Sequence, residues 1–279
     1  MTQQQDWITV GALADGFNLD NYTLPVSNDL NGRTLVLDGP SGESITYRFS
    51  QNAVGWSSAD HSISHEAASR VTSIREGIYL IDFLQQTDTS TASISLVLDV
   101  KQGVFTRVYG QLPTQDDQRS DLFRCALSGQ DLTPVSAQFT HGTIQGLYSG
   151  TSPSEANHPH QPTHELVGIR NCYAYSPHEV YEHIYLNENL YSWHCLSGVE
   201  RGLADTDRCH YFKLENELYL FVWREKIIPT LGLVLIDLKQ HRSDGKICGH
   251  TGDDLGQWSN FPVGSFSRIL NTTEYPGHE

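Results

Sequence analysis

One strand pattern occurs twice along this chain of 279 residues. The stretch GIYLIDFLQQ at 77–86 returns as ELYLFVWREK at 217–226, and SLVLDV at 95–100 returns as LVLIDL at 233–238. Both offsets lie near 139 residues. Similarity at a fixed offset indicates a duplicated structural unit, so we expect the two halves of the chain to share one fold.

The repeated unit is built from strands. Short runs rich in Val, Ile, Leu, Tyr and Phe alternate with turns rich in Gly, Asp and Ser, for example in GRTLVLDG at 32–39 and ESITYRFS at 43–50. Helical periodicity is scarce, and 116–127 is the best internal candidate for a helix. Strands of this length and spacing are typical of antiparallel barrels or sandwiches. We therefore predict an all-β protein of two tandem antiparallel barrels, each of a size to hold one small ligand.

Composition predicts the boundary between the halves. The run SGTSPSEANHPHQPT at 149–163 is rich in Pro, Ser and His and almost free of apolar residues, which indicates a linker. We expect an N-terminal barrel over 1–148 and a C-terminal barrel over 164–279.

Three histidines lie in or beside this linker: His158, His160 and His164. A histidine run in a polar linker is usually exposed, so we expect no metal site there.

The charge balance argues against two classes of partner. The chain has 18 Lys and Arg against 33 Asp and Glu, a formal net charge of −15, so no basic stripe neutralises the phosphates of nucleic acid or an anionic membrane surface. The first residues lack the basic and apolar regions of a secretory signal, and no apolar run is long enough to span a membrane, so we expect a cytoplasmic protein. The five cysteines are widely spaced without a CxxC pair and are expected to be reduced.

A carboxylate ends an aromatic stripe in the second half. Period two places Tyr219, Phe221, Trp223 and Glu225 on one face of a strand. If this face looks into a barrel, Glu225 loses hydration, which raises the pKa of its carboxyl and suits it to proton transfer.

Two observations limit this interpretation of Glu225. At the end of a strand the side chain could instead lie in water, paired with Lys226 or Arg224. The first half has Gln85 at the matching position, which cannot transfer a proton. Any acid–base chemistry is therefore expected in the second half, and we favour a structural role for the first.

The second half resembles a known family over YEHIYLNENLYSWHCLSGVERGLADTDRCHYFKLENELYLFVWREKIIPTLGLVLIDL. This stretch looks like the C-terminal domain of the molybdenum cofactor biosynthesis protein F (MoaF) family, and the duplicated architecture and total length match as well. The resemblance implies two lipocalin-like (calycin) barrels. The family's name comes from genetic context rather than from an assigned reaction. The sequence has no Gly-rich phosphate loop or basic cluster for a pterin phosphate.

The same half is similar to a second calycin family, the phenolic acid decarboxylases. The shared pattern consists, in chain order, of Tyr173-Ala-Tyr175, Tyr181-Glu182, Ser197-Gly198 and Trp223-Arg224-Glu225. This resemblance implies a reaction without a cofactor, in which Tyr173 and Tyr175 orient the substrate and Glu225 transfers a proton to or from carbon.

The sequence departs from the decarboxylase pattern at its arginine. Where that family has arginine after a glycine, this chain has Gly202-Leu203, flanked by Arg201 and Arg208. Either could supply the charge from a neighbouring position, so we do not predict phenolic acid decarboxylation itself. Arg208 either binds an anionic group in the cavity or pairs with Asp205 or Asp207.

Other side chains of the second half have two interpretations each. His183, His194 and His210 fall on predicted strands, where they could bind a metal or carry a proton, but a surface or core position is expected for each. Trp193 and Trp223 offer flat surfaces for a planar ligand, although aromatic residues in a small barrel are more often core.

The sequence therefore favours a lyase or isomerase, without cofactor or metal, that acts on a small aromatic or unsaturated molecule in the second barrel. The residues expected to be catalytic are Glu225, Tyr173 and Tyr175. Those expected to bind the substrate are Trp223, Arg208, Arg201, His194, Tyr219 and Phe221. The alternative is a non-catalytic, lipocalin-like binding protein. The one protein partner that we propose from the sequence is a second copy of the chain, in a homodimer.

Overall fold

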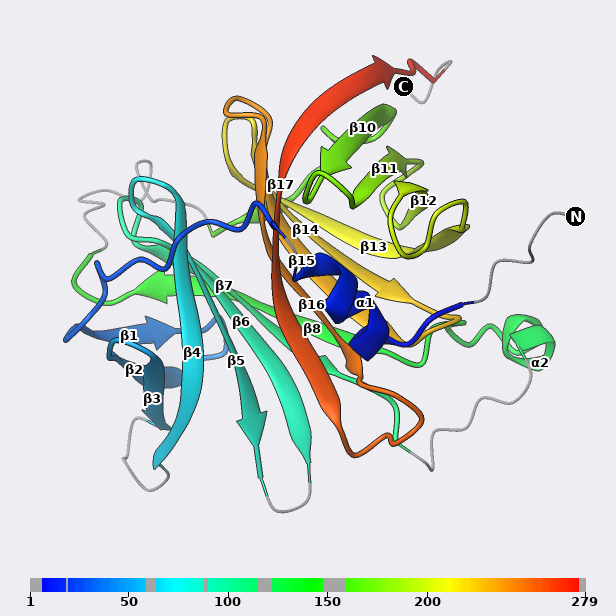
Figure 1. Ribbon diagram of the computed structural model, residues 1–279. Helices are drawn as coiled ribbons and strands as arrows, with labels where there is room; N and C mark the ends of the chain where they lie inside the picture. The colour runs from blue at the N-terminus through cyan, green and yellow to red at the C-terminus, as the bar shows by residue number, and fades with distance from the viewer. Residues whose placement is uncertain are drawn as a thin grey trace, which may run out of the picture. The chain divides into compact units, whose positions relative to one another are not determined.

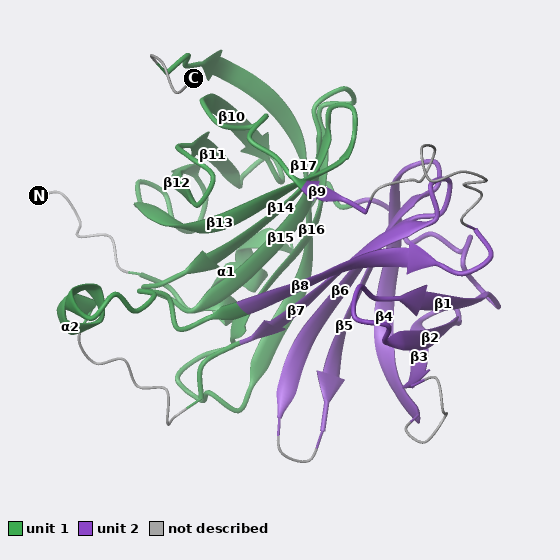
Figure 2. Cartoon of the chain, turned by 180° about the vertical axis from the view of Figure 1, so that it is seen from behind, with its two compact units in different colours: residues 1–23, 112–136, 162–279 green, residues 24–111, 137–161 purple. Residues whose placement is uncertain are grey.

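Contacts divide the chain into two compact units. The computed structural model describes residues 7–18, 20–58, 64–87, 90–114, 122–147 and 159–275. Unit 2 comprises 24–111 and 137–161, and unit 1 comprises 1–23, 112–136 and 162–279 (Figure 2).

Unit 2 contains a closed barrel in which each strand neighbours the next along the chain (Figure 1). Its strands are β1 (Thr34–Asp38), β2 (Ser44–Phe49), β3 (Ala53–Ser58), β4 (Ser64–Arg75), β5 (Ile78–Gln86), β6 (Thr91–Asp99), β7 (Val104–Gln111) and β8 (Ser136–Ile144). In β1, Leu35 and Leu37 are buried and their neighbours are more exposed, as the period of two requires.

Unit 1 contains a second barrel with the same order. Its strands are β10 (Ile169–Ala174), β11 (Val180–Tyr185), β12 (Leu190–Ser197), β13 (Ala204–Glu215), β14 (Leu218–Glu225), β15 (Thr230–Asp237), β16 (Arg242–His250) and β17 (Trp258–Thr272). Pairing of β12 with β13 and of β10 with β17 closes the ring, and the short β9 (Gln161–Pro162) is added beside β13. The helix α1 (Val10–Phe17) packs against β16 and β17, and α2 is Leu122–Leu127.

Strand register confirms the internal duplication. Ile78 pairs with Asp99 between β5 and β6, and Leu218 pairs with Asp237 between β14 and β15. These pairs align Phe83 with Trp223 and Gln85 with Glu225. The predicted all-β fold of two tandem calycin-like barrels is therefore confirmed.

An irregularity is repeated as well. The β4–β5 ladder shifts register between Ser73 and Arg75, and the β13–β14 ladder shifts between Lys213 and Glu215. Such bulges bend a strand and increase its twist, which helps a sheet to close into a barrel. Counted from this shared feature, Arg70 corresponds to His210.

The two units do not follow a single cut in the sequence. Residues 1–23 and 112–136 precede the predicted boundary at 148, yet they belong to unit 1 with the second barrel. The predicted linker lies outside the described residues over 149–158. Of the helix expected within 116–127, α2 is present and 116–121 lie outside the described residues.

The linker histidines do not share one environment. His158 lies outside the described residues, and His164 is exposed as expected. The expectation is wrong for His160, which is only 4% exposed because its Nδ1 hydrogen-bonds the buried Thr106 hydroxyl in unit 2 (2.8 Å).

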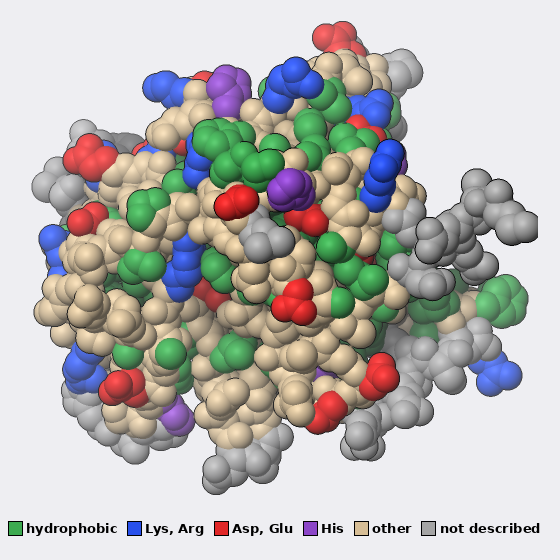
Figure 3. Space-filling view, in the orientation of Figure 1, with side chains coloured by type: hydrophobic (Ala, Val, Ile, Leu, Met, Phe, Trp, Pro, Cys, Tyr) green, Lys and Arg blue, Asp and Glu red, His purple; other side chains and the backbone are tan. Residues whose placement is uncertain are grey.

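Charged side chains are dispersed over one face of the molecule. On the face drawn in Figure 3, Lys and Arg lie scattered among Asp and Glu rather than gathered in one basic field. Neither described helix is long and apolar enough to cross a membrane.

Candidate active site in the second barrel

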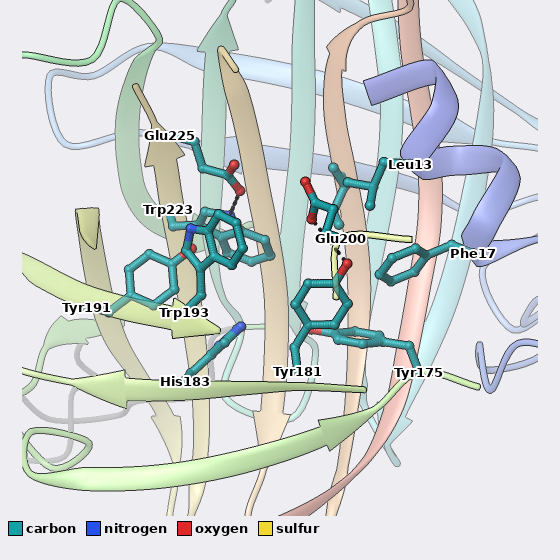
Figure 4. A pocket seen from close by; sticks show the side chains of 11 residues that line it. Leu13, Phe17, Tyr175, Tyr181, His183, Tyr191, Trp193, Glu200, Trp223 and Glu225 are labelled. Atoms are coloured by element: carbon teal, nitrogen blue, oxygen red, sulfur yellow. Dashed lines mark hydrogen bonds between the residues drawn. The ribbon is translucent and has the colours of Figure 1, made fainter. Parts of the chain in front are cut away.

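A cavity inside the unit 1 barrel brings aromatic and ionisable side chains together (Figure 4). Its aromatic walls are Phe17, Tyr175, Tyr181, Tyr191, Trp193 and Trp223. Its ionisable groups include His183, Glu200 and Glu225. The space left between these side chains is about 30 Å³, enough for about two water molecules.

The end of β14 places Glu225 in this cavity. Alternation along β14 turns Trp223 and Glu225 inward, as predicted, and the Trp223 indole Nε1 donates a hydrogen bond to Glu225 Oε1 (2.8 Å). The neighbouring strand has Gly232 opposite Trp223, and a Cβ at Gly232 would collide with the indole ring. The absence of a side chain at Gly232 therefore allows Trp223 to lie flat beside the carboxyl.

The surroundings of Glu225 favour its protonated form. Burial is the main cause that raises the pKa of this carboxyl well above its ordinary range, and the negative charges of Asp207 and Glu200 add to the rise. The hydrogen bond from Trp223 opposes the rise. These surroundings shift the pKa of the Glu225 carboxyl in the expected direction, upward, which favours its protonated form.

Asp207 is the carboxylate that acts most strongly on Glu225. It is buried, and Trp193 Nε1 donates to its Oδ2 (3.1 Å) while Lys226 Nζ lies 3.2 Å from its Oδ1. Burial raises the pKa of Asp207, and the Lys226 charge lowers it. Lys226 therefore pairs with Asp207, and with Asp205 at 2.6 Å, instead of with Glu225.

A tight turn delivers Glu200 to the same cavity. Gly198 in this turn has φ +132, and a Cβ there would collide with the buried carboxyl of Glu179. The Tyr181 hydroxyl donates to Glu200 Oε2 (3.1 Å). Burial raises the pKa of Glu200 to about 7, with Tyr181 opposing this rise and the charge of Glu179 adding to it.

His183 on β11 is neutral and only 4% exposed. Burial lowers the pKa of its imidazole to about 3. Its buried Nδ1 has no hydrogen-bond partner among the described residues. Because a buried polar atom without a partner is costly, His183 can accept or donate a hydrogen bond to a molecule in the cavity.

Helix α1 forms one wall of the cavity through Leu13 and Phe17. The side chain of Thr9 caps the helix by accepting from Ala12 N, and Gly11 N donates to Thr251 O (3.1 Å). A Cβ at Gly11 would collide with the Thr251 backbone, so this glycine allows α1 to lie close to the barrel.

The structure separates the predicted interior residues into two groups. Glu225, Trp223 and Tyr175 line the cavity. Tyr173 lies deeper, with its hydroxyl 2.6 Å from that of Tyr185 and within 3.0 Å of the Asn171 amide nitrogen that donates to it. Tyr173 is therefore part of the packed core of the barrel and does not line the cavity in which it was expected to contact a substrate.

Phe221 and Tyr219 also point into the barrel without lining the cavity. The Phe221 ring stacks between Trp223 (5.3 Å between centroids) and Tyr211 (5.5 Å). The Tyr219 hydroxyl donates to Glu165 Oε2 (2.7 Å), away from the carboxyl cluster. Both support the core beneath the site.

Three further residues predicted to bind the substrate also lie outside the cavity. Arg201 and Arg208 are exposed, and Arg208 Nε lies 3.6 Å from Asp131 Oδ1 instead of near Asp205 or Asp207. His194 is partly exposed and shares Glu182 with Arg170, at 2.9 and 2.6 Å. The strand parity that turns Trp193 inward turns His194 outward.

The histidines of this barrel therefore do not converge. His183 lies in the cavity, whereas His194 is in the ion pair with Glu182. Among the described residues, no group of three or more His, Cys, Asp or Glu side chains is arranged to hold a metal ion.

Sequence reasoning missed several residues of the site. Tyr191 could have been found, because it shares its strand face with Trp193. Glu200 lies in a loop and Phe17 lies far in sequence from the strands of the barrel, and neither position carries a periodic signal.

Both halves of the chain match domains of one known protein family. The MoaF N-terminal domain family matches residues 5–114, and the MoaF C-terminal domain family matches residues 160–273. The chain is 43% identical over 286 residues to Protein MoaF of Klebsiella aerogenes, covering 99% of each. The chain belongs to the MoaF family. In this MoaF chain the cavity draws on both family domains, because Leu13 and Phe17 lie in the N-terminal match and Glu200 and Glu225 in the C-terminal one.

One solved structure is weakly similar to this MoaF chain. It is the crystal structure of a putative beta-lactamase from Burkholderia vietnamiensis, 12% identical, which covers 38% of this chain and 95% of that chain with a TM-score of 0.33. At this score the likeness identifies neither a fold nor an activity.

Proposed function

We propose that the second barrel is the active site of a cofactor-independent lyase or isomerase, in which Glu225 transfers a proton to or from a carbon of a small aromatic or unsaturated molecule. The observation that carries this proposal is a carboxyl with a raised pKa, enclosed by aromatic rings and held by the Trp223 indole. A carboxyl whose pKa is raised in this way is suited to give a proton to a substrate carbon.

Glu200 supplies a second proton-transfer group. Its pKa of about 7 lets it exist in both protonation states near neutral pH, and burial also raises the pKa of Glu225. A donor and an acceptor that face one cavity suit a proton shift along an unsaturated substrate, since one group protonates a carbon while the other removes a proton.

The charge of the cavity selects the substrate. Glu200, Glu225 and Asp207 carry potential negative charge, which disfavours a substrate carboxylate beside them. Aromatic faces attract neutral planar molecules and cations. The proposed substrate is therefore neutral or positively charged at the end that meets Glu225, in contrast to a phenolic acid.

Substrate entry requires movement in the cavity wall. A space of about 30 Å³ is far below the few hundred Å³ of a typical small-molecule site. The wall formed by Leu13 and Phe17 belongs to a helix of only 8 residues. We place the opening there, because displacing α1 leaves the barrel strands intact.

The test begins with a thermal-shift screen of aromatic and unsaturated amines, aldehydes, enones and acids. Hits are then incubated in D₂O, and deuterium entering carbon positions, or a changed product, is followed by NMR and mass spectrometry. Glu225→Gln keeps the size and polarity of the side chain but removes the ionisable group, so turnover is expected to fall about 10²-fold or more with little change in affinity.

Glu188→Gln is the matched control, because Glu188 is exposed in the turn between β11 and β12. It is expected to leave turnover unchanged. If the hits bind and are neither converted nor labelled, and Glu225→Gln binds them equally well, the barrel is a carrier and the proposed reaction is wrong.

A further inference from the structure

The first barrel has an interior cavity of its own. It lies in unit 2, measures about 270 Å³, and is close to the lower end of the range for small-molecule sites. Strands β2, β3, β5, β6 and β7 all contribute side chains to its wall. The volume is far larger than the space left in the second barrel.

Arg107 on β7 supplies the charge of this cavity. Its Nη2 lies 3.5 Å from the Thr140 hydroxyl, a long hydrogen bond, and its buried Nε has no partner within the described part of the chain. The charge of the guanidinium and its hydrogen bond to Tyr47 both oppose the burial that raises the pKa of that phenol. No carboxylate among the described residues pairs with Arg107. A guanidinium with unused donors inside a barrel is suited to bind an anion.

The walls beside Arg107 are flat and aromatic. Trp56 packs on Phe83 with 5.0 Å between ring centroids, and Tyr109 lines the same space. Ile45 and Ile94 complete the apolar surface. Planar rings can stack on such a surface while an attached anionic group reaches the guanidinium.

The duplication shows how the two interiors diverged. Asp99 pairs with Val104 in the first barrel, and Asp237 pairs with Arg242 in the second, so Arg107 corresponds to Gly245. At the position of Glu225 the first barrel has Gln85, which also lines the cavity. The first cavity is thus neutral or positive where the second is acidic.

We infer that the first barrel is a binding site for a small planar anion, an aromatic or conjugated carboxylate whose charged group meets Arg107. Gln85 adds an amide to the wall of the same cavity, and Trp56 and Phe83 contact the ring. The site is separate from the one proposed in the second barrel, and either can fail without the other.

The experiment measures binding of benzoate and cinnamate to the full chain by calorimetry, with benzamide and benzylamine as neutral and cationic counterparts. The carboxylates are expected to bind with Kd in the millimolar range or tighter and to exceed benzamide. Arg107→Met is expected to weaken benzoate binding about tenfold or more. Arg107→Lys, which keeps the charge but loses the planar fork, is expected to weaken it less.

Two further variants control for folding and for location. Arg48→Met removes an exposed arginine on β2, another strand of this barrel, and is expected to leave benzoate binding unchanged. Gln85→Glu keeps the shape of the side chain, places a carboxylate in the cavity and is expected to abolish carboxylate binding while benzamide still binds.

The inference is overturned by any of three results. The first is that the carboxylates show no saturable binding at millimolar concentration. The second is that benzamide binds as well as benzoate. The third is that benzoate still binds to both the folded Arg107→Met variant and the folded Gln85→Glu variant.

Discussion

The two barrels have the same strand order, but the side chains that line their interiors differ in charge. Gln85 and Arg107 line the first cavity, whereas Glu225 and Gly245 stand at the matching positions of the second. Strand register keeps these positions equivalent, because the bulge and the hairpins that set it are shared. The fold therefore fixes where the interior side chains point, and a few of them decide which charge the interior accepts.

The barrels also differ in free space. At one pair of matching positions the first barrel has Ile94 beside Phe83, and the second has Gly232 beside Trp223. The larger cavity, about 270 Å³, lies in the first barrel, for which we had favoured a structural role. In the second, the indole and the neighbouring rings leave about 30 Å³. The missing side chain at Gly232 leaves room for the larger Trp223 ring, which fills the space beside Glu225.

The largest expected effect comes from exchanging this packing. Gly232→Ile introduces the residue of the first barrel where a Cβ already collides with Trp223. We expect a loss of about 3 kcal/mol or more in the free energy of unfolding, measured by denaturant titration, because a filled core cannot accept the added volume.

Gly252→Ala is the control for this exchange, since a Cβ there meets open space. It is expected to change stability by less than about 1 kcal/mol. Equal stability of Gly232→Ile and the unaltered chain would show that Trp223 moves freely, which contradicts the packing argument.

A second prediction concerns pH and separates the acidic barrel from the other. The folded pKa of Glu200, about 7, lies above its unfolded value of 4.5. Below pH 4.5 the group is protonated in both states, so its stabilising contribution is fully present there. As pH rises towards 7, only the unfolded chain releases the proton, and stability falls by up to about 3 kcal/mol.

Glu200→Gln removes this titration, so the free energy of unfolding should lose that part of its decline between pH 4.5 and 7. Denaturant titrations at several pH values measure the difference between the two proteins. Gln85→Glu provides the comparison in the first barrel, where Arg107 should hold the pKa of the new carboxyl down and leave no such decline. Identical pH profiles for Glu200→Gln and the unaltered chain would exclude a raised pKa at Glu200.

The smallest expected effect separates two tyrosines of the second barrel. Tyr175→Phe removes a hydroxyl from the cavity and is expected to weaken ligand binding by about 0.5–1.5 kcal/mol. Tyr173→Phe removes a hydrogen bond to Tyr185 in the core, so it should lower stability by about 1 kcal/mol without changing affinity. Affinity and melting temperature are measured on both variants. If Tyr173→Phe alone weakened binding, Tyr173 rather than Tyr175 would be the residue that contacts the ligand.

The sequence by itself determined the strands, the duplication and the inward face of β14. Each of these depends on a periodic pattern or on similarity at a fixed offset, both of which are local or additive along the chain. For this reason the aromatic stripe predicted the inward direction of Trp223 and Glu225 correctly. Gly202-Leu203 likewise showed in the sequence that the arginine of the decarboxylase pattern is missing.

Only the tertiary structure decided which residues meet around Glu225. Asp207 and Glu200 reach it from β13 and from a loop, and Phe17 reaches the cavity from a helix far away in sequence. The inward or outward direction of His194 and Arg208 depends on strand register, which a shift of one residue would reverse. Sequence patterns fix periods within an element, but the pKa of a carboxyl and the volume of a cavity depend on atoms that non-local packing brings together.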